Sequence, residues 1–183
     1  MLASASGAIA GVTTSTDQRN FVVQGTTARG LVRYMNSNAV SGDHGHAYAS
    51  IHPDYQLSLS TKQSGGMCRA SLVDVHIDFE LILPVAASPG GMSSRVRGAW
   101  NSFSNFARAH EGHHKASYTG CATSFVAQAR RQSAGQCFVL ESNIRQMLSQ
   151  MKRDCEARQM PFDRAQARVL RNMSLFSLAR WGK

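Results

Sequence analysis

The stretch His-Glu-Gly-His-His at residues 110–114 has the residue types and spacing of a metal site on a helix. Residues four apart lie on one helical face, so the imidazoles of His110 and His114 can reach one ion. Zinc readily takes imidazole nitrogen, and a catalytic zinc site leaves one position for water. Glu111 follows His110 by about 100° around the helix, where its carboxylate can act as general base. The stretch therefore predicts zinc-dependent hydrolysis through an activated water.

The other histidines fit this site less well. His113 lies about 100° back from His114, so we expect it to be exposed or beside the ligands. The remaining histidines are scattered over the predicted loop and sheet and are expected at the surface: His44, His46, His52 and His76. A second interpretation of residues 110–114 is a core helix whose histidines are satisfied by hydrogen bonds.

The elements that must position the motif lie in the second half of the chain. Ser93 or Ser94 can cap a long helix that reaches about residue 133. Its apolar side chains and both motif histidines follow steps of three and four residues, which predicts one buried stripe. A second, antiparallel helix is expected over residues 138–158, followed by a break at Pro161 and a third, basic helix from Asp163.

The first half of the chain predicts a small, mostly antiparallel sheet. The clearest strand covers residues 71–83, where apolar and polar side chains alternate until Pro84. Shorter strands are expected at residues 21–23, 47–51 and 55–59, with a short helix after Thr27. The predicted fold class is α+β, with this sheet packed on the motif helix and two further helices behind it. Residues 1–19 are predicted as a flexible N-terminal segment and residues 20–183 as a single domain.

The amino-acid composition limits which kinds of partner and which cellular compartment are expected for this protein. The 183 residues carry a formal net charge of +9, which suits an anionic surface of the cell envelope. No apolar run approaches the roughly 20 residues of a membrane span, and no nucleic-acid-binding motif occurs. Four cysteines without Cys-x-x-Cys spacing favour two disulfides, and three pairings are open. Four reduced core cysteines are the alternative.

Geometry gives one candidate for a third metal ligand. If the turn between the long helices centres near residue 135, the position opposite His114 is close to Glu156. Asp154 and Glu141 are less favoured. Asp163 is open to a different interpretation, because Gln166 follows it by three residues and the pair resembles a capping box for the last helix.

Several strings resemble a bacterial family of unknown function whose members are described as secreted or periplasmic zinc-dependent proteases. They are residues 21–26, the strand from Cys68 to Pro84, and residues 100–114. The resemblance implies a zincin-like domain in which His110 and His114 bind zinc and Glu111 is the catalytic base. Family members often end with Tyr-Asp-x-x-Thr-x-His-Gly. Here the Asp is kept as Asp163, whereas Gln166 and Arg168 stand at the Thr and His positions.

These observations favour a zinc metallopeptidase of the periplasm or of the secreted fraction, acting on a peptide or protein substrate. Asp163 is the first choice for the third zinc ligand and Glu156 the second. The alternative is a catalytically impaired envelope protein that retains the metal site and works by binding. A nucleic-acid-binding module is supported by the charge alone.

Overall fold

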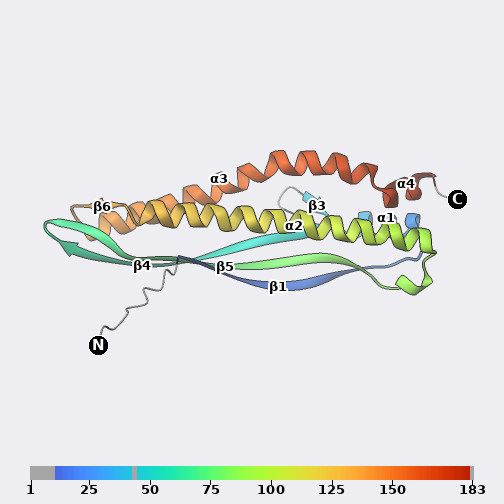
Figure 1. The fold of residues 1–183 in the computed structure, drawn as a ribbon, viewed down its shortest axis with the longest axis horizontal. Coiled ribbons are helices and arrows are strands. Elements are labelled where there is room, and N and C mark those ends of the chain that lie inside the picture. Colours follow the sequence, from blue (N-terminus) through green and yellow to red (C-terminus); the bar gives the residue numbers. More distant parts are fainter. Residues whose placement is uncertain (1–10, 43–44, 182–183) are drawn as a thin grey trace, which may run out of the picture.

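A mixed β-sheet and four α-helices form the computed structural model, which describes residues 11–42 and 45–181. The fold is α+β, as predicted. Helix α2 lies between the sheet and α3 (Figure 1). The elements are β1 (Val12–Val23), α1 (Ala28–Ser37), β2 (Val40–Gly42), β3 (Gly45–Ala47), β4 (Ser50–Ser64), β5 (Met67–Ala86), a 3-10 turn (Pro89–Gly91), α2 (Ser94–Ala129), β6 (Ser133–Ala134), α3 (Cys137–Asn172) and α4 (Ser174–Trp181).

The central strand β5 carries the predicted alternation. Val73, Val75, Ile77 and Phe79 are buried and belong to the core that includes α2 and α3, whereas the intervening side chains lie on the opposite, wetter face. The strand continues past Pro84 to Ala86. Pro84 lies beyond Ile82, where the pairing with β4 ends, so its missing N–H is tolerated there.

Two predictions about the N-terminal part of the chain were wrong, as strand β1 shows. It pairs with β5 in parallel, from Val12 opposite Val75 to Val23 opposite Ala86, so the sheet is mixed. It also includes residues 12–19, which were expected to be flexible; residues 1–10 lie outside the described residues. Residues 13–20 are polar and exposed, so no hydrophobic pattern marks them. Backbone hydrogen bonds to β5 hold this edge strand, and such bonds need no apolar side chain.

The motif lies in the middle of α2. The Oγ of Ser93 accepts a hydrogen bond from the backbone N–H of Val96 at 3.3 Å and so caps the helix start. The buried stripe includes Phe103, Ala107, His114 and Tyr118. This stripe packs against the sheet and α3. His114 lies on it as predicted, whereas His110 is only partly buried and Glu111 is also buried.

Helix α3 is longer than predicted, because Pro161 does not end it. Proline removes the hydrogen bond that its N–H would donate to the carbonyl of residue 157. Both Pro161 and Ala157 are exposed, so a water molecule can donate a hydrogen bond to the carbonyl of Ala157. One helix therefore covers the two that were expected, and Asp163 lies inside it instead of capping a new one.

Two disulfides join the layers. Cys68–Cys137 connects β5 to the first residue of α3, and Cys121–Cys155 connects α2 to the middle of α3. The prediction of two disulfides is confirmed, and the structure selects one of the three open pairings. Among the described residues, no helix combines the length and apolar character that a membrane crossing requires.

Candidate metal centre

Three potential metal ligands converge between α2 and α3. The Nε2 atoms of His110 and His114 lie 2.9 Å apart. The Oδ1 atom of Asp163 is 3.3 Å from His110 Nε2 and 2.9 Å from His114 Nε2. Two ligand atoms come from the motif helix and one from α3, so the relative position of these helices determines the geometry of the group.

The donor set and its spacing fit a divalent zinc ion. Tetrahedral zinc with ligand bonds of about 2.0–2.1 Å separates its ligand atoms by about 3.3 Å. The three distances observed here fall within about half an ångström of that value. Two imidazoles and one carboxylate would leave a fourth position for water or substrate, as in catalytic zinc sites.

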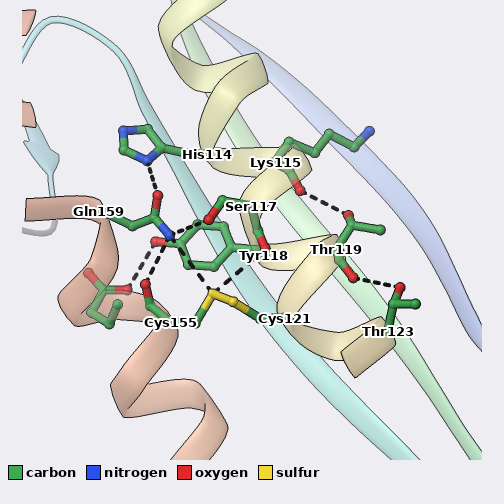
Figure 2. Close-up of a disulfide and its surroundings, with 10 residues drawn as sticks. His114, Lys115, Ser117, Tyr118, Thr119, Cys121, Thr123, Cys155 and Gln159 are labelled. Carbon is green, nitrogen blue, oxygen red and sulfur yellow. Dashed lines mark hydrogen bonds between the residues drawn. A yellow bond between two sulfur atoms is a disulfide. The ribbon is translucent and has the colours of Figure 1, made fainter. Parts of the chain in front are cut away.

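The amide of Gln159 orients His114 by contacting Nδ1, the ring nitrogen that does not belong to the group of ligand atoms (Figure 2). Gln159 Nε2 donates to Ser117 Oγ at 2.8 Å and to the backbone carbonyl of Cys155 at 2.9 Å. Because a carbonyl can only accept, the amide nitrogen must face that way, and Oε1 faces His114 Nδ1 at 3.0 Å. His114 therefore carries its proton on Nδ1. Its Nε2 is unprotonated and, on the side of His110 and Asp163, has a lone pair that can bind a metal ion.

His110 is held differently. Its ring stacks on Phe162 with ring centroids 5.0 Å apart, and Phe106 lies 6.2 Å away on the same helix. Its Nδ1 atom is buried and has no hydrogen-bond partner among the described residues. Burial, together with the neighbouring His114, lowers the pKa of His110 to about 4. The imidazole is thus neutral near pH 7, as a metal ligand must be.

Glu111 shares a cleft with the three ligand residues. The cleft has a volume of about 400 Å³ and is bounded by α2, α3 and residues 47–51, which run from the end of β3 into β4. Glu111 is only 5% exposed and lines this cleft with His110, His114 and Asp163. A carboxylate in this position can hold a proton-donating water or peptide N–H next to the metal position.

The other predicted candidates lie elsewhere. Glu156 accepts a hydrogen bond from the Tyr118 hydroxyl at 3.0 Å and is not part of the ligand group. His113 is exposed and stacks on Phe162, with ring centroids 3.9 Å apart. His76 lies on the sheet face opposite the helices, where it contacts Thr13 and Asp78, and His52 contacts the backbone of Ser41. His44 lies outside the described residues, as does the side chain of His46.

Two residues that shape the centre were missed from the sequence. Gln159 lies between Cys155 and Asp163 at four-residue steps on α3, so all three share one helical face. That spacing is a usable signal once the Cys121–Cys155 pairing is known. Phe162 stands at the tyrosine position of the terminal string and was not singled out, although its ring contacts both His110 and His113.

The departure from the terminal family string leaves the group of three intact. Arg168, at the histidine position of that string, is exposed and does not line the cleft. Gln166, at the threonine position, does line it. Asp163, the residue of the string that this chain keeps, is the one that reaches the histidines.

Comparison with known proteins places the chain in a family. Residues 18–169 match the family model DUF922, described as a bacterial protein of unknown function. No curated protein and no solved structure matches the chain. The matched segment contains β5, both long helices up to Val169, and every residue of the candidate centre. The chain belongs to the bacterial family DUF922.

Proposed function

We propose that this protein is a zinc-dependent hydrolase that cleaves peptide bonds. The observation that supports it is the convergence of His110, His114 and Asp163 beside Glu111 in one cleft. The donor types and spacing suit zinc. Zinc would be held by the three ligand residues, and when bound it supplies Lewis acidity that acidifies water and polarises a carbonyl.

The chain's own residues have separate roles in this proposal. Gln159 keeps the proton of His114 on Nδ1, so that Nε2 stays available as a ligand atom. Glu111 takes a proton from the attacking water and delivers it to the leaving amine nitrogen. The low exposure of Glu111 limits competing solvent around that carboxylate. The disulfides suit an oxidising compartment, and we propose the periplasm or secretion as the location.

The test is a three-way comparison of metal content and peptidase activity. Wild-type protein, purified without added metal, is expected to hold about one zinc per chain and to cleave a mixed peptide library. Glu111→Gln is expected to keep the zinc and lose cleavage, and His110→Ala/His114→Ala to lose both. Cleavage that survives in Glu111→Gln would refute the base assignment. A wild type that holds zinc but cleaves nothing in the library would favour the binding-protein alternative.

A further inference from the structure

Three arginines border the cleft on α3. Arg164, Arg168 and Arg171 are spaced by four and three residues, so they share one helical face. Each directly follows a residue that lines the cleft: Asp163, Ala167 and Leu170. One residue corresponds to about 100° around the helix, which places the arginines along the rim; Arg171 itself also lines the cleft. We call these three residues the arginine rim.

The positive charge of the arginine rim is not neutralised within the described part of the protein. All three side chains are exposed, and no described carboxylate lies within ion-pair distance of their guanidinium groups. No acidic residue follows Asp163 in the sequence. The acids of β5 have other partners: Asp74 pairs with Arg130, Asp78 with His76 and Glu80 with Arg19. The rim therefore creates a positive potential beside the catalytic cleft that an anionic ligand would meet.

The opposite wall of the cleft offers a hydrogen-bonding group. Ser50, at the start of β4, lines the cleft and is 4% exposed. Its Oγ atom is buried and has no hydrogen-bond partner among the residues that the structure describes. Apolar side chains such as Phe103, Ala107 and Leu170 line the same cleft. A ligand that fills the cleft would thus meet this hydroxyl as well as the apolar side chains and the group of three potential metal ligands.

We propose that the cleft selects peptide segments that carry acidic side chains, whose carboxylates pair with the arginine rim. This inference rests on the proposed peptidase function and names its substrate class. In an extended peptide, alternate side chains point to opposite sides, so one set can enter the apolar cleft while the other reaches the rim. Alternate residues are roughly 6.6 Å apart, and Arg164 and Arg168 are about 6 Å apart along the helix axis.

This two-sided pattern favours a peptide over a nucleic acid. A single strand of nucleic acid places a charged phosphate at every unit, whereas the cleft combines apolar walls with a row of cations on one side only. The Ser50 hydroxyl on the other wall can bond the peptide backbone, which every substrate segment presents.

The experiment measures binding, so that it does not depend on cleavage. Fluorescence anisotropy is recorded for two labelled peptides, one with alternating Leu and Glu and the other with Gln in place of each Glu. The protein is the full chain with Glu111→Gln, measured with and without added zinc. We expect the Glu peptide to bind about tenfold more tightly than the Gln peptide at low salt, and the difference to shrink as salt rises.

A matched variant pair locates the effect. Arg164→Gln/Arg168→Gln/Arg171→Gln is expected to abolish the preference for the Glu peptide. Arg131→Gln/Arg145→Gln/Arg153→Gln removes the same charge from exposed positions away from the cleft and is expected to retain it. Equal affinity for the two peptides would overturn the proposal, as would an equal loss in both triple variants. A single-stranded oligonucleotide that binds through the rim while the Glu peptide does not would also overturn it. A selective peptide that wild type never cleaves would instead count against the peptidase function alone.

Discussion

Gln159 and Asp163, four residues apart on α3, contact the two ring nitrogens of the same histidine: Gln159 meets His114 Nδ1 at 3.0 Å and Asp163 meets Nε2 at 2.9 Å. One face of α3 thus sets both the proton position of His114 and the third ligand of the group. Because Gln159 is 2% exposed, water cannot easily replace its amide if it is lost.

Gln159→Leu is expected to raise the zinc Kd of the protein by about 10- to 100-fold, because His114 Nδ1 would lose its acceptor in a buried position. The Kd is measured by competition with a chelator of known affinity. Gln150→Leu, an exposed substitution on the same helix, serves as the control and should leave the Kd unchanged. An unaltered Kd in Gln159→Leu would mean that the amide does not position the ligand.

The third ligand can be assigned with two carboxylate variants. Asp163→Ala is expected to lower zinc occupancy sharply after dialysis against metal-free buffer, because a ligand within 3.3 Å of both histidines is removed. Glu156→Gln should keep full occupancy, since Glu156 is bonded to Tyr118 and lies outside the group. Elemental analysis measures the zinc content of both variants. Loss of zinc in Glu156→Gln alone would show that Glu156, and not Asp163, is the third ligand.

The two disulfides are expected to differ in their effect on the metal. Cys121→Ala/Cys155→Ala frees α3 from α2 next to Gln159 and should raise the zinc Kd as well as lower the Tm. Cys68→Ala/Cys137→Ala opens a loop of 69 residues, compared with 34 for the other bond. Because the stabilisation by a disulfide grows only with the logarithm of loop length, the loss of stability is similar, about 4 kcal/mol in each case.

That second variant is therefore a control for stability. Its zinc Kd should stay near the wild-type value, because Cys68 and Cys137 join β5 to the start of α3, far along the helix from Asp163. Kd values are compared well below both melting temperatures. Equal increases in Kd would show that general loosening, and not the α2–α3 connection, controls the site.

Zinc is expected to stabilise the fold. A ligand present at 100 times its Kd adds about 2.7 kcal/mol, which corresponds to a rise of roughly 5–10 °C in Tm for a chain of this size. Differential scanning calorimetry with zinc and with a chelator measures the shift. His110→Ala/His114→Ala should show no shift, and a shift of equal size in that variant would indicate zinc bound elsewhere.

The two faces of β5 predict different costs for similar truncations. Ile77→Ala removes a side chain with 0% exposure from the core and is expected to cost about 2–5 kcal/mol. Leu72→Ala acts on a side chain that is 42% exposed on the same strand and should cost less than about 1 kcal/mol. Urea unfolding of the two variants provides the comparison. Equal costs would contradict the assignment of the buried face.

The spacing of His110 and His114 was enough to predict their common face, because helical periodicity is fixed by local geometry. Glu156 was a weaker prediction for a clear reason. Counting residues from the turn gives the height of a residue along α3 but not its rotation about the helix axis. The Cys121–Cys155 disulfide fixes that rotation, with Gln159 and Asp163 on the same face as Cys155. Since the pairing was open, the rotation was open too.

Strand β1 and Pro161 show what local patterns miss. Residues 13–20 carry no apolar alternation, and they become a strand only because β5 offers unpaired backbone groups along its edge. Pro161 usually marks a helix end, yet α3 continues through it, with Gln159 buried just before it and the Phe162 ring packed on His110 just after it. In both places a long-range contact decides the structure, and single-sequence patterns do not report such contacts.

The position of the Cys121–Cys155 bond along the helix pair has a mechanical consequence. His110 lies 19 residues from the end of α2 at Ala129, or about 28 Å at the helical rise. If the two helices could pivot only at their connecting turn, each degree of opening would move the ligands apart by about 0.5 Å, more than zinc coordination tolerates. The bond moves the pivot to within about 16 Å of His110, so the same angular fluctuation produces little more than half that displacement. Oxidation of these two cysteines thus acts as a lever-arm constraint on the accuracy with which the chain can hold an ion.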